Sequence, residues 1–279
     1  MNDAATVRRA LAVCGLEPLD AQVLLAHVVG RDRAWVAAHA GDTLGNEFAE
    51  TFAALAARRR AGEPVAYLTG MREFWGLPLA VSPAVLIPRP ETETLVELAL
   101  AQLPADRDVR VLDLGTGSGA IALAIAHERP RARVLATDMS SAALAIAREN
   151  ARRLAIANVE FVESDWYAAL SGTRHELRFD LIASNPPYVA PGDPHLTQGD
   201  LRFEPAVALA PGGEGLAAIR VIIAGARQWL VPGGALALEH GFDQAEAVRA
   251  LFVGAGWADI TSARDLAGIE RAITARLPR

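Results

Sequence analysis

Between residues 110 and 255 the sequence alternates short apolar runs with segments of helical periodicity, and this alternation constrains the fold most strongly. The apolar runs cover residues 110–115, 132–138, 159–164, 179–184 and 234–240, and the helical segments cover 119–128, 140–154, 214–230 and 243–255. Apolar runs that alternate with helices are typical of a parallel sheet covered on both faces. We therefore predict an α/β fold here, with a last strand at 271–277 on the edge of the sheet.

The first 72 residues have a different character and predict a separate helical domain. Phe48, Phe52 and Leu55 follow the i, i+4, i+7 spacing of one buried helical stripe. From residue 73 the sequence changes to valine, leucine and aromatic residues interrupted by glycine and proline, which is typical of a short hairpin. The predicted organisation is a helical domain at 1–72, a β-hairpin linker at 73–88 and an α/β domain at 89–279.

Composition excludes several functional classes. The formal net charge of −6 argues against general binding to nucleic acid or to anionic membranes. All 27 basic residues are arginine, so mechanisms that need a lysine, such as a Schiff base, are excluded. Cys14 is the single cysteine, which excludes an internal disulfide and a multi-cysteine metal site. We see neither a signal-peptide pattern nor an apolar run of membrane-spanning length, and we expect a soluble cytoplasmic protein.

A glycine-rich turn follows the first apolar run of the α/β region. Gly115, Gly117 and Gly119 lie where the chain leaves a strand and enters a helix. Glycine at such positions permits a sharp turn and a close approach of a ligand to the backbone. With Ala120 the spacing also satisfies the loose dinucleotide-binding pattern. The turn alone therefore leaves open a nicotinamide dinucleotide, S-adenosylmethionine and a purely structural role.

Polar residues also end the next two predicted strands. Asp138 ends the second strand, where a carboxylate can accept hydrogen bonds from both hydroxyls of a ribose. After the third strand, Asp165 could accept from an adenine amine and Trp166 could stack on the ring, although Trp166 also suits a protein core. Ligands of open α/β sheets lie beyond the carboxyl ends of the strands. Together these residues predict a nucleoside site at that edge.

The fourth strand ends in Asn185-Pro186-Pro187-Tyr188, and the two prolines prevent it from continuing inside a sheet. Asparagine and proline are ordinary turn formers, so a simple turn is one interpretation. The chemical interpretation is that the Asn185 side-chain oxygen and the Pro186 carbonyl accept the two N–H groups of a planar NH2, on which Tyr188 stacks. Beside a nucleoside site, this favours methyl transfer to such a group, a reaction that depends mainly on orientation.

Several blocks of this sequence resemble one known family. "DLGTGSGAIALAIA" (113–126), "SNPPY" (184–188) and "PHLTQGDLRFEP" (194–205) are together similar to the protein-glutamine methyltransferases of the HemK/PrmC family. The similarity extends to residues 63–93, 238–241 and 264–276. The resemblance implies a Rossmann-like adenosylmethionine-dependent methyltransferase sheet with helices on both faces. It also implies methyl transfer from S-adenosylmethionine to the glutamine of the Gly-Gly-Gln motif in peptide-chain release factors.

The resemblance also implies roles for individual positions. The methionine part of the cofactor would lie against the glycine turn, the ribose against a carboxylate and the adenine between an acid and an aromatic ring. The implied cofactor residues are Gly115, Thr116, Gly117, Ser118, Gly119, Asp138, Asp165, Trp166 and Asn185, and the implied catalytic residues are Asn185, Pro186, Pro187 and Tyr188. Arg89 and Glu91 match a block at the mouth of the active site, although a structural Arg–Glu pair is an equal alternative. Independently of the resemblance, a Gly-Gly-Gln loop alone offers little surface, so we expect residues 1–72 to dock the rest of the protein substrate.

Three alternatives stay open at this point. A DNA adenine methyltransferase would use the same four-residue motif, but the acidic balance and the lack of room for a target-recognition domain disfavour it. A nicotinamide oxidoreductase leaves the Asn-Pro-Pro-Tyr segment unexplained, and a non-catalytic binding module leaves the nucleoside site unexplained. His195 and His240 have no partner at metal-ligand spacing, and methyl transfer from a sulfonium needs no metal, so we expect none. We also expect a monomer that binds neither nucleic acid stably nor a membrane.

Overall fold

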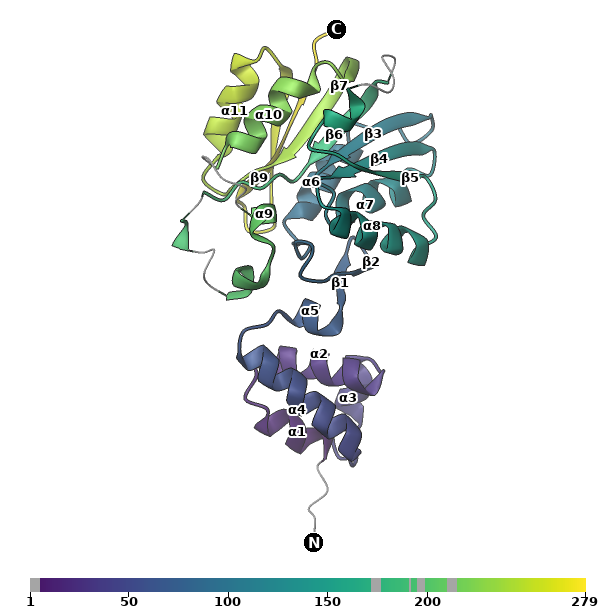
Figure 1. The fold of residues 1–279 in the computed structure, drawn as a ribbon, viewed down its shortest axis with the longest axis vertical. Helices are drawn as coiled ribbons and strands as arrows, with labels where there is room; N and C mark the ends of the chain where they lie inside the picture. Colours follow the sequence, from purple (N-terminus) through teal and green to yellow (C-terminus); the bar gives the residue numbers. More distant parts are fainter. Residues whose placement is uncertain (1–5, 172–176, 191, 195–198, 210–214) are drawn as a thin grey trace. The chain divides into compact units, whose positions relative to one another are not determined.

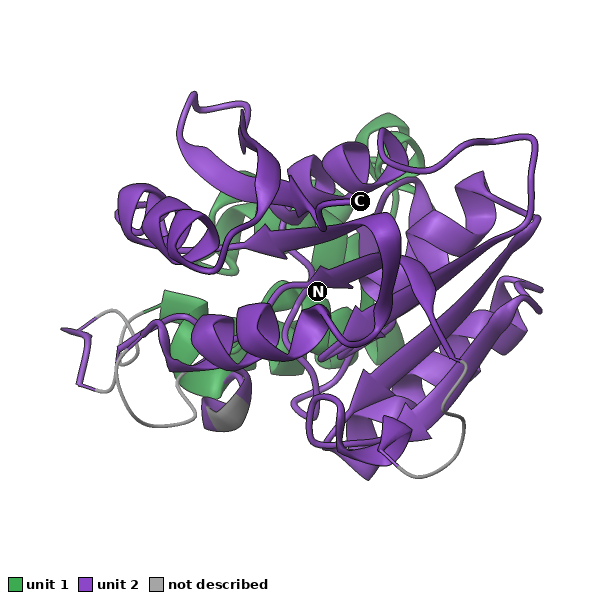
Figure 2. Ribbon diagram, turned by 90° about the horizontal axis from the view of Figure 1, so that it is seen from above, with its two compact units in different colours: residues 1–71, 197–203 green, residues 72–196, 204–279 purple. Residues whose placement is uncertain are grey.

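The computed structural model describes residues 6–171, 177–190, 192–194, 199–209 and 215–279 (Figure 1). The chain divides into two compact units, which Figure 2 shows in different colours. Unit 1 contains residues 1–71 and 197–203, and unit 2 contains residues 72–196 and 204–279. Among the described residues, no helix is both long enough and apolar enough to cross a membrane.

Unit 1 is a small helical bundle packed around Leu24, Leu25, Val36 and Phe52. Its helices are α1 (Val7–Val13), α2 (Pro18–Val29), α3 (Arg33–Ala38), α4 (Asn46–Arg60) and α5 (Val65–Thr69). Helix α2 starts at a proline, whose missing N–H is unneeded there, and ends at a glycine in the left-handed conformation. The stripe of buried residues on α4 is narrower than the i, i+4, i+7 spacing predicted. Phe52 is 2% exposed, whereas Phe48 is 43% exposed.

A short segment from the second half of the chain completes unit 1. The 3-10 helix η3 (Gly199–Phe203) contacts the end of α4. Arg59 donates hydrogen bonds to Asp20 at 2.7 Å and to Asp200 at 2.9 Å, and Arg202 donates to the carbonyl of Ala61. Arg59, near the end of α4, is therefore paired with acidic residues from two distant parts of the sequence.

Unit 2 is built on a seven-stranded sheet with the order β5-β4-β3-β6-β7-β9-β8. Its strands are β3 (Val109–Leu114), β4 (Ala132–Asp138), β5 (Val159–Glu163), β6 (Phe179–Ser184), β7 (Leu230–Glu239), β8 (Ala258–Arg264) and β9 (Glu270–Arg276). Neighbours from β5 to β7 pair in parallel, whereas β9 pairs antiparallel with both β7 and β8. The predicted edge position of the last strand is wrong. Residues 272–275 of β9 are buried. The edge is formed instead by β8, in which exposed residues recur among partly buried ones.

Alternate residues of the strands form two cores, one on each face of the sheet. Val109 and Val111 of β3 belong to one core, whereas Leu112 and Leu114 belong to the other. Helices α6 (Thr92–Leu100), α7 (Ala120–Glu128) and α8 (Ser141–Arg153) cover the first face, and α10 (Ala217–Ala226) and α11 (Ala245–Gly254) cover the second (Figure 1). The short elements η1 (Ala168–Leu170) and α9 (Ala206–Leu209) complete the unit. Burial on both faces explains why these strands read as continuous apolar runs.

A β-hairpin, β1 (Met71–Phe74) and β2 (Leu77–Ala80), leads into unit 2. Its two turn residues, Trp75 and Gly76, both have positive φ, as the tightest hairpin turns require. Phe74 and Leu79 are buried in the first core of unit 2. The fully buried Asn150 of α8 donates to the carbonyls of Ala80 and Ser118 and accepts from the N–H of Ala80. This one side chain ties the hairpin to the glycine turn after β3.

Candidate active site

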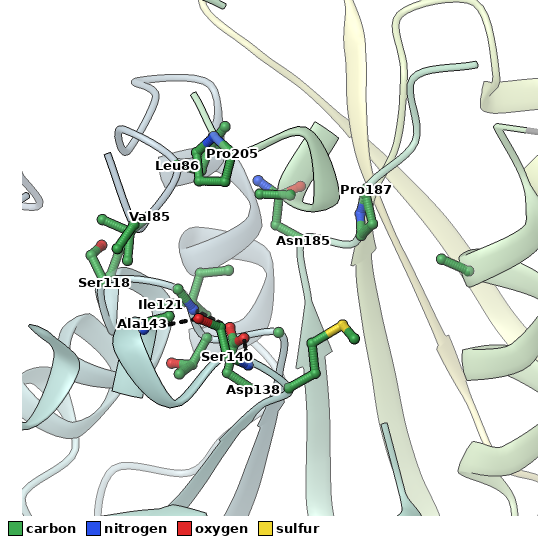
Figure 3. Close-up of a pocket in the computed structure, with 18 of the residues that line it drawn as sticks. Val85, Leu86, Ser118, Ile121, Asp138, Ser140, Ala143, Asn185, Pro187 and Pro205 are labelled. Carbon is green, nitrogen blue, oxygen red and sulfur yellow. Dashed lines mark hydrogen bonds between the residues drawn. The ribbon is translucent and has the colours of Figure 1, made fainter. Parts of the chain in front are cut away.

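A cavity of about 380 Å³ lies at the carboxyl ends of the parallel strands (Figure 3). Ten of the residues singled out in the sequence line it: Arg89, Gly115, Thr116, Gly117, Ser118, Asp138, Asp165, Trp166, Asn185 and Pro187. Four others, Glu91, Gly119, Pro186 and Tyr188, are not part of its wall. The wall also contains apolar residues that the sequence analysis did not single out individually, including Val85, Leu86, Ile121 and Met139. The volume lies within the range of about 300–1,000 Å³ typical of small-molecule sites.

The glycine turn after β3 forms one side of the cavity. Gly115, Gly117 and Gly119 have φ values of 72°, 56° and 87°, a region that other residues adopt at a cost. A Cβ on Gly119 would stand 3.0 Å from the Leu123 side chain, so this glycine serves close packing. The Cβ position at Gly117 has no atom within 4 Å. At Gly117, therefore, a ligand can reach the backbone closely.

Asp138, the last residue of β4, is fixed by two backbone groups (Figure 3). Its Oδ2 accepts from the N–H of Gly117 at 2.9 Å, and its Oδ1 accepts from the N–H of Ser140 at 2.9 Å. Each carboxylate oxygen can accept a second hydrogen bond, and the residue lies in the cavity wall. Asp138 therefore holds the glycine turn in place and still offers acceptors to a ligand.

Trp166 follows β5 and reaches the wall through an unusual backbone conformation. Its φ is 47°, which is uncommon for a residue with a bulky side chain. The buried Ser164 hydroxyl stabilises this turn, because it donates to the carbonyl of Trp166 at 2.9 Å and accepts from the N–H of Ala169 at 3.0 Å. The ring lies in the cavity wall and is half-buried against the second core. Its position is therefore compatible with packing in the core and with an exposed ring face at the cavity.

Asn185 follows β6, and the Nδ2 end of its side-chain amide points at the protein. Its Nδ2 donates to the hydroxyl of Thr92 at 3.2 Å. Thr92 is 4% exposed and begins α6, so it is a firmly placed acceptor. Figure 3 shows Asn185 and Pro187 side by side on the cavity wall. The arrangement leaves Asn185 Oδ1 as the atom offered to a ligand. Nothing in the sequence connected Thr92 with this motif.

Tyr188, at the other end of the motif, is bound to a residue that the sequence reasoning did not assign. Its hydroxyl donates to Glu239 Oε1 at 3.1 Å, and burial raises the pKa of the tyrosine. Glu239 ends β7 and is 2% exposed. Burial raises the pKa of the Glu239 carboxyl to about 7, although the hydrogen bond from Tyr188 opposes the increase. The sequence signal that could have identified Glu239 is an acidic residue at the end of an otherwise apolar strand.

A second unassigned carboxylate, Asp113, lies near the end of β3. It is fully buried, and burial raises its pKa to about 7. The nearby charge of Asp138 adds to this increase, and the Thr116 hydroxyl opposes it. The glycine turn therefore begins beside a buried carboxyl group whose surroundings favour its neutral form.

Arg89 and Glu91 do not form the pair that their proximity in sequence suggested. Arg89 makes an ion pair with Glu204, whose side chain is fully buried, and Arg89 also lies in the cavity wall. Glu91 stands outside the wall, and its Oε2 is buried without a hydrogen-bond partner among the described residues. Arg89 thus links the strand-end site to the loop that contains Glu204.

The two histidines stay outside this site. His240 is buried, its Nδ1 donates to the carbonyl of Gly241 at 2.9 Å, and burial lowers its pKa. His195 lies outside the described residues. Within the part of the chain that the structure describes, no three His, Cys, Asp or Glu side chains gather as a metal site would require.

Comparisons with known proteins agree with this geometry. Residues 93–215 match the family model of the methyltransferase small domain, and residues 5–70 match that of the PrmC N-terminal domain. The Thermus thermophilus 16S rRNA N2 G1207 methyltransferase, solved with AdoMet and guanosine, is 21% identical, with a TM-score of 0.54 over 74% of this chain and 49% of that one. The fold and the site together define a methyltransferase, and the predicted Rossmann-like sheet with helices on both faces is confirmed.

Two relatives narrow the class. The release factor glutamine methyltransferase of Burkholderia pseudomallei is 54% identical over 98% of this chain and 97% of that protein. That of Bordetella pertussis is 55% identical over 94% of this chain and 95% of that protein. The chain belongs to the family of release factor glutamine methyltransferases. The nicotinamide oxidoreductase and the non-catalytic module considered from the sequence are therefore wrong.

Proposed function

We propose that this chain transfers a methyl group from S-adenosylmethionine to the side-chain amide nitrogen of the glutamine in the Gly-Gly-Gln motif of peptide-chain release factors. One observation carries the proposal furthest. Asn185 lies in the cavity wall with Nδ2 committed to Thr92, so that its Oδ1 faces a ligand. An acceptor in this position suits a substrate that presents N–H groups. The names of the relatives give release factor glutamine as their substrate.

The residues around the glycine turn fit S-adenosylmethionine. The open Cβ position at Gly117 lets the backbone approach the methionine part, and Asp138 retains acceptors for the ribose hydroxyls. Trp166 offers a flat apolar face for the adenine, and Asp165 offers an acceptor for its amine. When bound, S-adenosylmethionine supplies a methyl group that its sulfonium centre makes electrophilic. No metal is needed for this chemistry.

The Asn-Pro-Pro-Tyr segment positions the amide of the substrate. A glutamine amide has two N–H donors in one plane. Asn185 Oδ1 accepts one of them at the cavity wall, and the carbonyl of Pro186, which follows Asn185 directly but does not itself line the cavity, accepts the other. The prolines fix φ on both sides of that carbonyl, so its direction is constant. Hydrogen bonds from both N–H groups favour rehybridisation of the nitrogen and expose its lone pair. Orientation of this quality can contribute about 7–11 kcal/mol to lowering a barrier.

The test is transfer of label from S-adenosylmethionine, with the modified residue located by mass spectrometry. The chain is incubated separately with a release factor, with the same factor in which the Gly-Gly-Gln glutamine is alanine, and with unmethylated DNA. Label on that glutamine, and none on the alanine variant, is the expected result. Label on adenine would contradict the proposed substrate but would agree with the proposed binding of a planar NH2 group. No label on any acceptor would overturn the proposed function.

Residues 1–72 form the proposed docking domain for the release factor, because a Gly-Gly-Gln loop alone offers little surface. Deleting them is expected to raise the apparent KM for the release factor about tenfold or more, the loss of about 1.4 kcal/mol of binding. The Kd for S-adenosylmethionine, measured by calorimetry, serves as the control for folding of residues 73–279 and should stay within twofold. An unchanged KM in a truncated chain that binds the cofactor would remove the docking role.

A further inference from the structure

The carbonyl of Tyr188, at the far end of the Asn-Pro-Pro-Tyr segment, accepts a hydrogen bond from a residue outside the cavity wall. Gln244, which immediately precedes α11, donates to it from Nε2 at 3.0 Å. The Oε1 atom of the same side chain accepts from the backbone N–H of Gly241 at 2.9 Å. The partly buried side chain of Gln244 therefore joins the loop after β6 to the turn after β7.

The two backbone groups leave the Gln244 amide a single orientation. A backbone N–H can only donate, and a carbonyl can only accept. With the amide reversed, its NH2 would face the N–H of Gly241 and its oxygen would face the carbonyl of Tyr188, so both hydrogen bonds would be lost. The N–H of Gly241 therefore directs the Nε2 donor of Gln244 at Tyr188.

Two glycines give this side chain the space that it occupies. A Cβ on Gly215 would stand 2.5 Å from the carbonyl oxygen of Tyr188 and 2.9 Å from Gln244 Nε2, which is too close for either atom to keep its position. A Cβ on Gly241 would stand 3.0 Å from Gln244 Cδ. Three loops therefore meet at this hydrogen bond: the loops after β6 and β7 and the one that leads into α10.

The peptide group that follows Tyr188 is held on both of its edges. Gln244 donates to its carbonyl, and its N–H, which belongs to Val189, donates to the carbonyl of Leu209 at 3.1 Å. The two groups lie in one plane because the peptide bond does not rotate freely. The Tyr188 ring is held separately, since its hydroxyl donates to Glu239. The end of the Asn-Pro-Pro-Tyr segment is thereby attached to three other elements.

A rigid segment keeps its direction only when both of its ends are attached. Proline fixes φ at Pro186 and Pro187, and a residue before proline is also restricted in ψ, so these two residues move as one unit. Asn185 attaches one end of the unit through its hydrogen bond to Thr92. The peptide group after Tyr188 attaches the other end, and the Pro186 carbonyl between them is held in one direction.

We propose that Gln244 is a positioning residue for methyl transfer, which fixes the peptide group after Tyr188 and so holds the Pro186 carbonyl in the direction that the substrate amide requires. The inference rests on the proposed function and deepens it, because part of the grip on the substrate then depends on a residue outside the four-residue motif. Gln244 acts through Tyr188 and does not itself line the cavity.

The first test is Gln244→Glu, which keeps the length of the side chain and the acceptor for Gly241 but turns an oxygen instead of a donor towards the Tyr188 carbonyl. We expect kcat to fall about tenfold or more, with the KM for the release factor and the Kd for S-adenosylmethionine within about twofold. Gln228→Glu, the same change at an exposed residue after α10, should match the wild type. An unchanged kcat, or a loss confined to KM or Kd, would overturn the inference.

Gly215→Ala disturbs the same hydrogen bond without changing Gln244. Its methyl group cannot coexist with the present positions of the Tyr188 oxygen and Gln244 Nε2. We expect a fall in kcat similar to that of Gln244→Glu, again with the Kd for S-adenosylmethionine within about twofold. Gly254→Ala, at the end of α11 where a Cβ meets no atom within 4 Å, is the matched control and should keep wild-type kcat.

A second measurement does not depend on activity. Of the three tyrosines, only Tyr188 is followed by valine, so a chain labelled with ¹³C-carbonyl tyrosine and ¹⁵N-valine gives one correlated NMR signal, from this peptide group. In both Gln244→Glu and Gly215→Ala the Tyr188 carbonyl signal should move upfield, and the N–H of Val189 should exchange faster with solvent. The signal should stay in place in Gln228→Glu and Gly254→Ala.

The two measurements together separate this inference from the proposed function. A lower kcat in variants whose carbonyl signal is unchanged would overturn the inference, because the loss would then have another cause. A displaced signal with full kcat would overturn it as well. If the signal moves as expected but the wild type transfers no label to a release factor, the hydrogen bond from Gln244 is supported and the proposed function is overturned.

Discussion

Replacing Asn185 with alanine is expected to lower kcat roughly 10²- to 10³-fold, the usual loss when one preorganised hydrogen-bonding group of a reacting centre is removed. The variant keeps the glycine turn, Asp138 and Trp166, so the Kd for S-adenosylmethionine should stay within a few-fold of the wild-type value. The measurement is single-turnover transfer to a saturating release factor, with calorimetry for the cofactor. Single turnover isolates the chemical step from product release.

Asn185→Asp provides the matched comparison. Aspartate keeps an acceptor of the same shape but cannot donate to Thr92 at 3.2 Å as the amide does. We expect a loss of kcat close to that of Asn185→Ala. A side chain that can accept a hydrogen bond from the substrate is not sufficient when the direction of its acceptor oxygen is not fixed. If Asn185→Ala instead retained full turnover, the amide grip itself would be wrong.

Replacing Asp138 with alanine is expected to raise the Kd for S-adenosylmethionine roughly 100-fold or more. The carboxylate makes two charge-assisted bonds to the backbone and is proposed to accept from the ribose, and hydrogen bonds to a charged group contribute about 1.5–3 kcal/mol each. Asp106→Ala, at an exposed residue before β3, is the control and should leave the Kd unchanged. Titration calorimetry measures both.

The effect of Asp138 on the ribose can be separated from its effect on the glycine turn. S-adenosylhomocysteine and its 2′-deoxy analogue are compared in the wild type and in Asp138→Ala. The wild type should bind the deoxy analogue more weakly, and the difference should vanish in the variant, as a double-mutant cycle requires of two groups in contact. A preference that persists in Asp138→Ala would mean that another residue accepts from the ribose.

Much of unit 2 could be predicted from local sequence because its strands are buried on both faces. β4 and β6 have the predicted boundaries. The glycine turn follows the carboxyl end of β3, and Asp138 ends β4, as the general topology of such sheets requires. The cavity then brings ten of the selected residues together. These features depend on residues adjacent in sequence, which is the range over which periodicity and turn chemistry carry information.

The features that were missed depend on pairing between distant residues. β8 escaped notice because an edge strand with one exposed side lacks a continuous apolar run. Thr92 and Glu239 belong to the site only because α6 and β7 approach the loop after β6 in the folded chain. In the sequence, Asp200 was considered only as part of the block at residues 194–205. In the structure its carboxylate makes an ion pair with Arg59, near the end of α4. Local spacing contains no information about such partners.

The conformation of Trp166 has an optical consequence. Of the five tryptophans, Trp166 is the one in the cavity wall, and Trp229 and Trp257 are buried in the second core. Trp35 and Trp75 pack against other parts of the molecule. An adenine stacked on the Trp166 indole would quench the emission of one fluorophore and leave four as an internal reference. With the proposed stacking, the unmodified chain would contain its own spectroscopic reporter of cofactor occupancy.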